Sequence, residues 1–383
     1  MNGTIYMPVG EVCSSISDTY REKKNMVTLI NTSDVLEGRV LNHERVPNSN
    51  LKGQFKKTFQ RDDILYSEIR PQNRRFAYVD FSPIDYIAST KLMVIRAKKD
   101  VVSPKYLYYF LKNSSTVAEL QLLAETRSGT FPQITFSEVA NLTIPVPSLA
   151  VQEVIVQTMQ CLEDKITCNE QINDNLADFL QTVYQERFGD TGLVANQGIL
   201  SDICSYSRDK VAVSELNVST YFSTENMLSG KAGSTEATSL PITSQTTACH
   251  KGDTLISNIR PYFKKIVYCE DNCGCSTDVL CFTPSQPRYS AYLFSTLYAD
   301  KFFAFMVAGS KGTKMPRGDK QQIMTYPVVL PSEEELAGFN TIALPLLEQI
   351  YSNRSENKRL SILRDTLLPK LMSGEIDVSA VQL

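Results

Sequence analysis

The sequence contains the same module twice, and this duplication limits the possible folds more than any other feature. Residues 63–71 read DILYSEIRP and residues 253–261 read DTLISNIRP, so the pattern D-x-L-x-S-x-I-R-P recurs 190 residues later. From Pro132 and Pro316 onward the two copies keep a constant offset of 184 residues. Because internal repetition indicates duplicated structural units, we expect two halves that share one fold.

Each copy ends in a segment with the pattern of a long helix. Residues 148–190 and 332–383 both follow a proline that stops the preceding chain, and both begin with a serine that suits a helix N-cap. Apolar and asparagine residues then recur at intervals of four and three, the spacing of a coiled-coil seam. The seam positions are Leu162, Ile166, Asn169, Asn173 and Leu176, and in the second copy Leu346, Ile350, Asn353, Asn357 and Leu360. The pattern predicts two long helices that pack on each other.

The asparagines on this seam have two interpretations. Inside a packed seam, they would fix the register and the partner of a helix at some cost in stability. On a half-exposed helix, they would simply be solvated. Pro345 lies within the second segment, where it removes a backbone hydrogen bond, so we expect it to kink or restart that helix.

The remaining sequence alternates between short β-rich runs, such as residues 76–79, and short helical runs, such as residues 104–111. It therefore predicts a mixed α/β fold with two tandem globular domains and two long helices. The expected divisions are a first domain at 1–147, a first helix at 148–190, a second domain at 191–331, and a second helix with a C-terminal tail at 332–383.

Composition indicates a globular chain without a membrane segment. The chain of 383 residues is 42% hydrophobic and 21% charged, and no stretch approaches the roughly 18 to 20 apolar residues of a membrane helix. The N-terminus lacks the basic and apolar regions of a secretory signal, and the nine cysteines are scattered, as is typical of reduced thiols. We therefore expect a cytoplasmic protein.

The net charge of −3 conceals an uneven distribution. Residues 148–188 carry seven acidic and two basic side chains, and residues 332–372 carry six acidic and five basic ones. The rest of the chain is consequently basic overall. Any contact with a polyanion such as DNA is therefore expected outside the long helices.

Basic residues cluster where one strand of each copy ends in Ile-Arg-Pro. A strand that ends in this way and then turns places its cations on a rim, where arginine can hold phosphate or bind guanine through two hydrogen bonds. Amide side chains beside them suit adenine edges. The candidate DNA-binding residues are Ser67, Arg70, Gln72, Asn73, Arg74 and Arg75, and in the second copy Ser257, Asn258, Arg260, Lys264 and Lys265. The alternative for any one of them is an ordinary solvated turn.

A second basic element is a glycine-containing loop just before Pro132 and Pro316. Glycine with small hydroxyl residues exposes backbone N–H groups to an anion, and the flanking cations add charge. The loop candidates are Arg127, Gly129 and Thr130, and in the second copy Lys311, Gly312, Thr313, Lys314 and Arg317. The GxxxxGK[ST] pattern of a nucleotide-binding P-loop does not occur in the sequence.

The sequence offers little for catalysis. It has two histidines, and the GxGxxG and GxSxG patterns are absent. Glu163-Asp164-Lys165 resembles part of a nuclease motif, but its place on a helix favours a surface cluster. The spacing of Cys269, Cys273, Cys275 and Cys281 departs from paired CxxC zinc knuckles and has no counterpart in the first copy, so we expect reduced cysteines and no metal, with zinc as the alternative.

Together these features resemble the specificity (S) subunit of type I restriction-modification systems. The resemblance covers essentially the whole chain. It rests on two variable half-length domains, the D-x-L-x-S-x-I-R-P segment, the Gly-Thr loops before proline, the I-P-V-P-S and V-V-L-P-S helix entries, and the ending LLPKLMSGEI at residues 367–376.

The resemblance implies two target-recognition domains that each read one half of an asymmetric, bipartite site on double-stranded DNA. An antiparallel pair of coiled-coil helices would hold them apart and dock two modification (M) methyltransferase subunits. The M subunits would bring S-adenosylmethionine and flip an adenine for methylation, and restriction (R) subunits, where present, would bring ATP and Mg²⁺. This chain would be non-catalytic and bind no cofactor itself.

Other assemblies and functions stay open at this stage. The same scaffold would serve a methylation-only complex or a fused restriction enzyme. An independent enzyme such as a nuclease would cleave or methylate DNA alone. A duplicated protein-interaction scaffold would have no DNA role.

Overall fold

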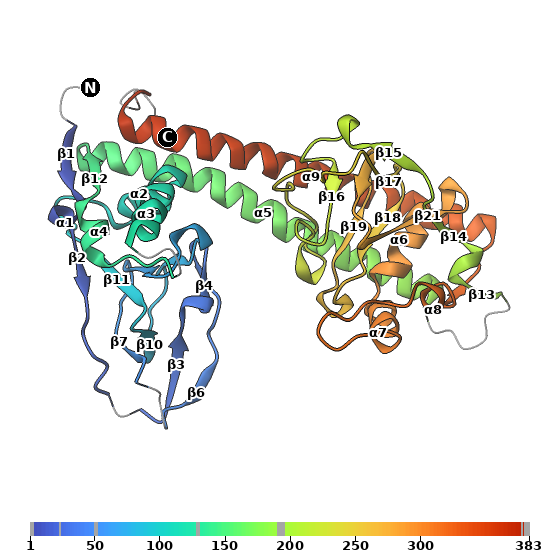
Figure 1. Cartoon of the computed structure of the whole chain (residues 1–383), viewed down its shortest axis with the longest axis horizontal. Coiled ribbons are helices and arrows are strands. Elements are labelled where there is room, and N and C mark those ends of the chain that lie inside the picture. Colours follow the sequence, from blue (N-terminus) through green and yellow to red (C-terminus); the bar gives the residue numbers. More distant parts are fainter. Residues whose placement is uncertain are drawn as a thin grey trace. The chain divides into compact units, whose positions relative to one another are not determined.

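The computed structural model describes residues 4–22, 24–49, 53–127, 131–189, 196–376 and 378. The chain forms two compact units (Figure 1). Unit 1 comprises residues 1–166 and 357–383, and unit 2 comprises residues 167–356. The boundary crosses both long helices, so each unit takes one part of each helix.

Unit 1 contains two four-stranded sheets. The first is fully antiparallel, and its inner strands are almost completely buried because they carry runs of aliphatic residues. In spatial order its strands are β2 (Cys13–Ile16), β11 (Leu92–Ala97), β8 (Ile64–Ser67) and β9 (Phe76–Tyr78). The second sheet has the order β6 (Arg45–Pro47), β3 (Met26–Ile30), β10 (Tyr86–Ser89) and β7 (Phe55–Lys57), with β3 and β10 parallel.

Smaller elements complete unit 1. Helix α2 packs between the first sheet and the long helices, where Tyr106 and Leu107 are fully buried (Figure 1). The helices are α1 (Val9–Val12), α2 (Pro104–Lys112), α3 (Ser114–Arg127) and α4 (Phe136–Asn141). Two antiparallel strand pairs join β1 (Ile5–Pro8) to β12 (Thr143–Val146) and β4 (Val35–Leu36) to β5 (Arg39–Val40).

Unit 2 repeats the first sheet of unit 1 strand for strand, as the duplication predicts, whereas the second sheets share three strands and differ in the edge to which the fourth is added. Its first sheet has the order β14 (Cys204–Tyr206), β21 (Val279–Pro284), β18 (Thr254–Ser257) and β19 (Ile266–Tyr268). Its second sheet has the order β15 (Lys210–Ala212), β17 (Gln245–Cys249), β20 (Cys273–Cys275) and β16 (Tyr221–Phe222). Strand β13 (Gln197–Ile199) pairs with β22 (Pro327–Val329), and the short helices are α6 (Ser290–Tyr298), α7 (Asp300–Ala308) and α8 (Lys320–Ile323).

The two long helices are α5 (Leu149–Phe188) and α9 (Glu333–Ser373), close to the predicted segments. Ser332 caps α9 as expected, since its Oγ accepts a hydrogen bond from the Glu335 N–H at 3.2 Å and the Glu335 carboxylate accepts one from the Ser332 N–H at 2.8 Å. Helix α9 is continuous through Pro345, so the predicted restart is wrong. Phe339 and Leu347, on either side of this proline, are both buried in the core of unit 2, and this packing favours one unbroken helix.

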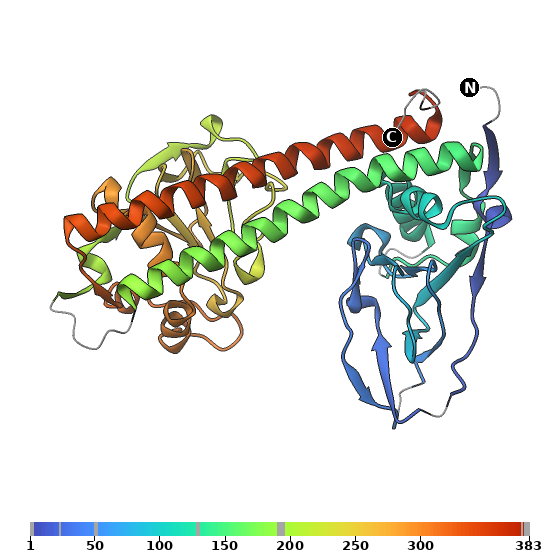
Figure 2. The ribbon, with the colours of Figure 1, turned by 180° about the vertical axis from the view of Figure 1, so that it is seen from behind.

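Within each unit α5 and α9 lie side by side and antiparallel (Figure 2). In unit 1 the start of α5 packs near the end of α9, and in unit 2 the end of α5 packs near the start of α9. The packed residues include Ile155, Val156 and Met159 with Leu368, Leu371 and Met372 in unit 1, and Leu180, Val183 and Tyr184 with Leu336, Phe339 and Ala343 in unit 2. Among the described residues, none of the helices is long and apolar enough to cross a membrane.

The seam asparagines are hydrogen-bonded between the helices. Asn353 Nδ2 donates to Asn173 Oδ1 at 2.9 Å, and Asn169 Nδ2 donates to a Glu356 carboxylate oxygen at 2.7 Å. Asn169, Asn173 and Asn353 are buried, so the solvated alternative does not hold for these three. Asn357 is half-buried and donates to the carbonyl oxygen of Ile166 at 3.2 Å.

The other predicted seam residues have mixed exposure. Ile350 is buried. Leu162, Ile166, Leu176, Leu346 and Leu360 are half-buried.

Candidate nucleic-acid interface

The same strained turn follows the same strand in both units. Strands β8 and β18 lead into the 3₁₀ turns η2 (Pro71–Asn73) and η6 (Pro261–Phe263). Left-handed backbone flanks each turn, with φ of 43° at Arg70 and 50° at Arg74, and 49° at Arg260 and 51° at Lys264. Such conformations cost non-glycine residues about 1–3 kcal/mol and cluster at functional sites. Their repetition marks these turns as candidate sites.

Ser67 and Ser257 shape the turns from inside. Ser67 Oγ accepts a hydrogen bond from the Ile69 N–H at 3.0 Å, and Ser257 Oγ donates to the carbonyl oxygen of Ile259 at 3.3 Å. Both serines are only 2% exposed. Their position suits support of the turn better than direct contact with a ligand.

In each unit the turn is hydrogen-bonded to the proline that follows the second basic element. The N–H of Arg70 donates to the carbonyl oxygen of Pro132 at 3.1 Å, and the N–H of Arg260 donates to that of Pro316 at 2.8 Å. Isolated β-bridges also join Ile69 to Gln133 and Ile259 to Arg317. In unit 2 the structure thus brings the two elements together, and in unit 1 it places Pro132 and Gln133 against the turn. We call the turn together with this neighbouring segment tip 1 in unit 1 (residues 69–75 and 131–133) and tip 2 in unit 2 (residues 259–265 and 311–317).

The basic side chains at and near tip 1 differ in whether they have partners within the protein. The Arg70 side chain is exposed, and its guanidinium has no hydrogen bond or ion pair with any part of the chain that the structure describes. The Arg74 guanidinium donates to Ser114 Oγ at 2.9 Å, and that of Arg75 donates to the Ser33 carbonyl oxygen at 3.0 Å. Arg127, at the end of α3, pairs with Glu138 at 2.5 Å.

The other candidates of the first copy lie around this turn. Gln72 and Asn73 are exposed, and the Gln72 N–H donates to Gln121 Oε1 at 3.2 Å. Gly129 and Thr130 lie outside the described residues.

In tip 2 most cations have protein partners. Lys264 pairs with Asp300 at 3.0 Å, and Lys265 Nζ donates to the Thr224 carbonyl oxygen at 2.6 Å, where burial lowers the pKa of Lys265. Lys311 pairs with Asp319 at 2.6 Å, and Arg317 pairs with Asp278 at 3.0 Å. Both of these pairs include an exposed cation. Because exposed ion pairs contribute about 0–1 kcal/mol, such cations can exchange a carboxylate for a phosphate at little cost.

The remaining candidate residues of the second copy differ in exposure. Gly312, Thr313 and Lys314 are exposed. Asn258 is 6% exposed, and its Oδ1 lacks a hydrogen-bond partner among the described residues. Arg260 is half-buried, and its Nε likewise has no hydrogen-bond partner there.

Four exposed apolar side chains at the tips were not among the sequence candidates. They are Tyr262 (50% exposed), Phe263 (38%), Phe131 (48%) and Met315 (48%). The constant offset of 184 residues pairs Phe131 with Met315, directly before the two prolines. This pairing was the available sequence signal for Phe131 and Met315.

The motif fragment Glu163-Asp164-Lys165 joins α5 to α2. Glu163 forms an ion pair with Lys112 and accepts a hydrogen bond from the Tyr109 hydroxyl at 2.9 Å. Burial lowers the pKa of Lys112. These contacts give Glu163 a structural role between helices.

The cysteines of the second copy form part of a buried core. Cys269, Cys273, Cys275 and Cys281 pack with Cys249, which lies opposite Cys273 in the paired strands. Hydrogen bonds between thiols and burial raise the pKa of Cys249 and of Cys269. Within the described part of the chain, no group of three or more His, Cys, Asp or Glu side chains is arranged to hold a metal ion.

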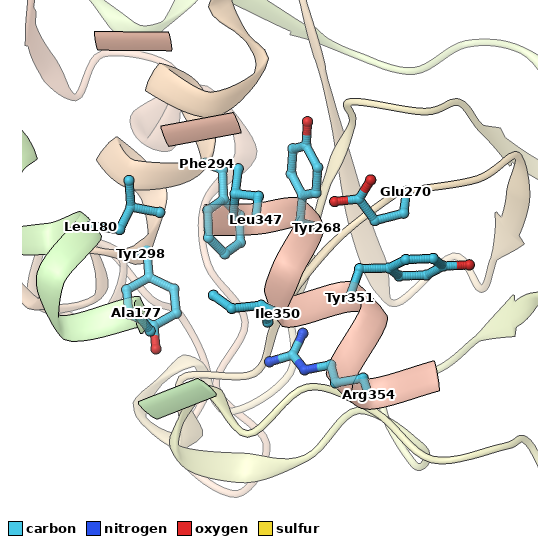
Figure 3. Close-up of a pocket in the computed structure, with 10 residues that line it drawn as sticks. All are labelled: Ala177, Leu180, Tyr268, Glu270, Phe294, Tyr298, Leu347, Ile350, Tyr351 and Arg354. Atoms are coloured by element: carbon cyan, nitrogen blue, oxygen red, sulfur yellow. The ribbon is translucent and has the colours of Figure 1, made fainter. Parts of the chain in front are cut away.

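One pocket in unit 2 lies between the long helices and the globular part (Figure 3). Its wall is mainly aromatic and aliphatic, with Tyr298 and Leu347 among the lining residues and Arg354 at one side. The cavity volume is ≈ 30 Å³. This is the space of roughly one water molecule, so the pocket is too small to enclose a nucleotide or a cofactor as large as a nucleotide.

Residues 6–177 match the family described as Type I restriction modification DNA specificity domain. Over 187 residues, or 49% of this chain, the sequence is 40% identical to the type I restriction enzyme HindI specificity subunit of Haemophilus influenzae, and the match spans 41% of that protein. A second match, 23% identical over 338 residues, covers 78% of this chain and 76% of the type I restriction enzyme MjaIX specificity subunit of Methanocaldococcus jannaschii.

The fold is similar to that of a type I restriction-modification system S subunit from M. genitalium. The TM-score is 0.54 at 17% sequence identity, over 97% of this chain and 96% of that one. The predicted class, mixed α/β with two β-rich domains and two long packed helices, is confirmed.

Proposed function

We propose that the chain is a specificity subunit of the type I restriction-modification family that residues 6–177 match, and that it reads a bipartite site on double-stranded DNA, with one half-site for each unit. The family is non-catalytic, so the proposed role is recognition. Target recognition is assigned to residues 1–147 and 191–331, and spacing to residues 148–190 and 332–383.

The observation that carries this proposal is the recurrence of one tip in both units. In each tip a strained Arg-Pro turn is joined to a second proline by a hydrogen bond from the N–H of Arg70 or Arg260. Cations at a rim position a protein on phosphates, while a few neighbouring side chains read base edges. Two similar tips with different side chains suit a site whose two halves differ in sequence.

The long helices are proposed to space the units and to dock two M subunits. Their seam is closed by buried asparagines, which favour a single register. Residues 148–188 carry an excess of acidic side chains, which suits a protein partner better than DNA. S-adenosylmethionine would then lie on the M subunits, and ATP with Mg²⁺ on any R subunits.

Mapping of methylated adenines in a genome that carries this gene with its M partner tests the proposal. We expect a bipartite motif with a gap of fixed length. A continuous motif, or no methylation dependent on this chain, would contradict it. Loss of unmethylated plasmids in the same cells separates a restricting complex from a methylation-only one.

The rival without a DNA role is a protein-interaction scaffold, and the double variant Arg70→Ala with Arg260→Ala distinguishes it. If the tips hold phosphates, affinity for duplex DNA falls, and the slope of log K against log salt concentration decreases by about one for each lost contact. The scaffold predicts no change in either quantity.

A further inference from the structure

The two tips share one backbone but expose different side chains at the same two positions. The turn of tip 1 exposes Gln72 and Asn73, and the turn of tip 2 exposes Tyr262 and Phe263. Left-handed residues flank both turns, and both prolines at their starts are buried. Because the backbone is common, the difference between the tips is one of side-chain chemistry.

Tyr262 and Phe263 form a single apolar surface. Their ring centroids are 4.7 Å apart, and the rings are tilted by 56°. Met315, 48% exposed, precedes the proline that accepts the hydrogen bond from Arg260. Three large apolar side chains exposed together on one tip form a patch of the kind that marks a contact surface.

Charge around this surface indicates the class of ligand. Arg260, Lys311, Lys314 and Arg317 belong to the same tip, and Lys314 has no ion pair among the described residues. An apolar patch bordered by cations fits a polyanion that also offers an apolar group. DNA meets this description, because the C5-methyl group of thymine is the apolar feature of the base edges in the major groove.

We propose that Tyr262 and Phe263 determine the specificity of unit 2, and that they read thymine in its half-site through contact with the C5-methyl group. This inference rests on the proposed DNA-reading function. Two tilted rings side by side offer a broad apolar surface to a methyl group.

The test uses the full chain with its M partner and a pool of random 40-base-pair duplexes. The wild type should select a bipartite sequence with at least one T·A pair in the half-site of unit 2. Replacement of that thymine by uracil removes only the methyl group and should weaken binding about 4-fold for each methyl in contact. The double variant Tyr262→Gln with Phe263→Asn, which carries the side chains of tip 1, should lose the thymine preference and its sensitivity to uracil.

Two controls keep this result specific. Ile242→Ala removes a fully exposed apolar side chain of unit 2 outside the tip and should leave selection unchanged. The half-site of unit 1 should be the same for the wild type and both variants, and an unchanged urea denaturation midpoint shows that unit 2 of each variant folds.

Several outcomes would overturn the inference. They are a unit 2 half-site without thymine, an unchanged preference in the double variant, and an equal weakening of both half-sites. Loss of the M partner with unaltered DNA selection would assign the aromatic pair to a protein contact and would equally overturn it. If the wild type selects no bipartite sequence, the proposed function itself fails.

Discussion

At the scale of single residues, the repeated aspartate, Asp63 in the first copy and Asp253 in the second, has different side-chain partners in the two units. Asp63 accepts two hydrogen bonds of 2.7 Å from the Arg96 guanidinium. Both aspartates accept a backbone hydrogen bond of 2.8 Å, Asp63 from Gln60 and Asp253 from His250, but the side-chain partner of Asp253 is Cys281 Sγ, at 3.2 Å. Both carboxylates are 1% exposed. Burial raises the pKa of Asp253 above its usual value.

Substitution of each aspartate by asparagine should therefore have opposite effects. Asp63→Asn removes the partner of Arg96 and should lower the free energy of unfolding of unit 1 by about 1–3 kcal/mol. A carboxyl group whose pKa is raised by folding destabilises the native state as the pH rises above its unfolded value of 3.8. Asp253→Asn should remove this loss of native-state stability. Urea denaturation at pH 7 should then show unit 2 of the variant to be more stable than that of the wild type.

The two variants serve as matched controls for each other, since each replaces a buried aspartate at the same repeat position. Measurement at pH 5 and pH 8 separates the electrostatic effect from packing. Equal destabilisation by both substitutions, independent of pH, would show that the two surroundings are energetically the same.

At the scale of elements, the helix seam depends on a buried polar pair. Asn353 donates to Asn173 and also accepts a hydrogen bond from Gln349 Nε2 at 2.8 Å. Such a pair stabilises one alignment because any shift leaves a buried amide without a partner.

Asn353→Leu alone should destabilise unit 2 by about 1–3 kcal/mol, because it leaves Asn173 buried without this partner. Asn173→Leu with Asn353→Leu should recover much of this loss through apolar packing. A double-mutant cycle by urea denaturation measures the coupling. Asn175→Leu is the control, since Asn175 lies on the exposed face of α5, the helix that carries Asn173. It should change stability by less than about 0.5 kcal/mol. Additive single and double effects would exclude coupling of the pair.

The junction between the helices and the globular part also differs between the copies. In unit 1 it contains the Lys112–Glu163 ion pair, and the equivalent of Glu163 at an offset of 184 is Leu347, buried in the apolar core of unit 2. Divergence thus extends from the tips to the attachment of the helices. The hydrogen-bonded seam is common to both units.

At the scale of the whole molecule, the duplication predicts that the units are exchangeable. Replacement of residues 1–147 by the corresponding domain of a relative with a different target should alter one half of the methylated motif and keep the other half and the gap. The physical reason is that each unit has its own core and its own tip. Genome-wide methylation mapping reads the result, and a change in both halves would contradict independent reading.

The sequence alone determined the duplication, the mixed α/β class, the two long helices and the strand-end position of Arg70 and Arg260. These follow from local rules, since hydrophobic periodicity, capping and turn residues act over a few neighbours. The predicted restart of the helix at Pro345 was wrong, because the packing of Phe339 and Leu347 on the core favours one continuous helix.

Only the tertiary structure decided which candidates are exposed. It buried Ser67, Ser257 and Asn258, gave Arg74 and Lys264 protein partners, and left Arg70 exposed. It also placed Pro132 and Pro316 against the repeated turns and brought Tyr262 and Phe263 to the surface. Contacts between residues far apart in sequence settle these questions, because exposure and pairing depend on neighbours that no local pattern specifies.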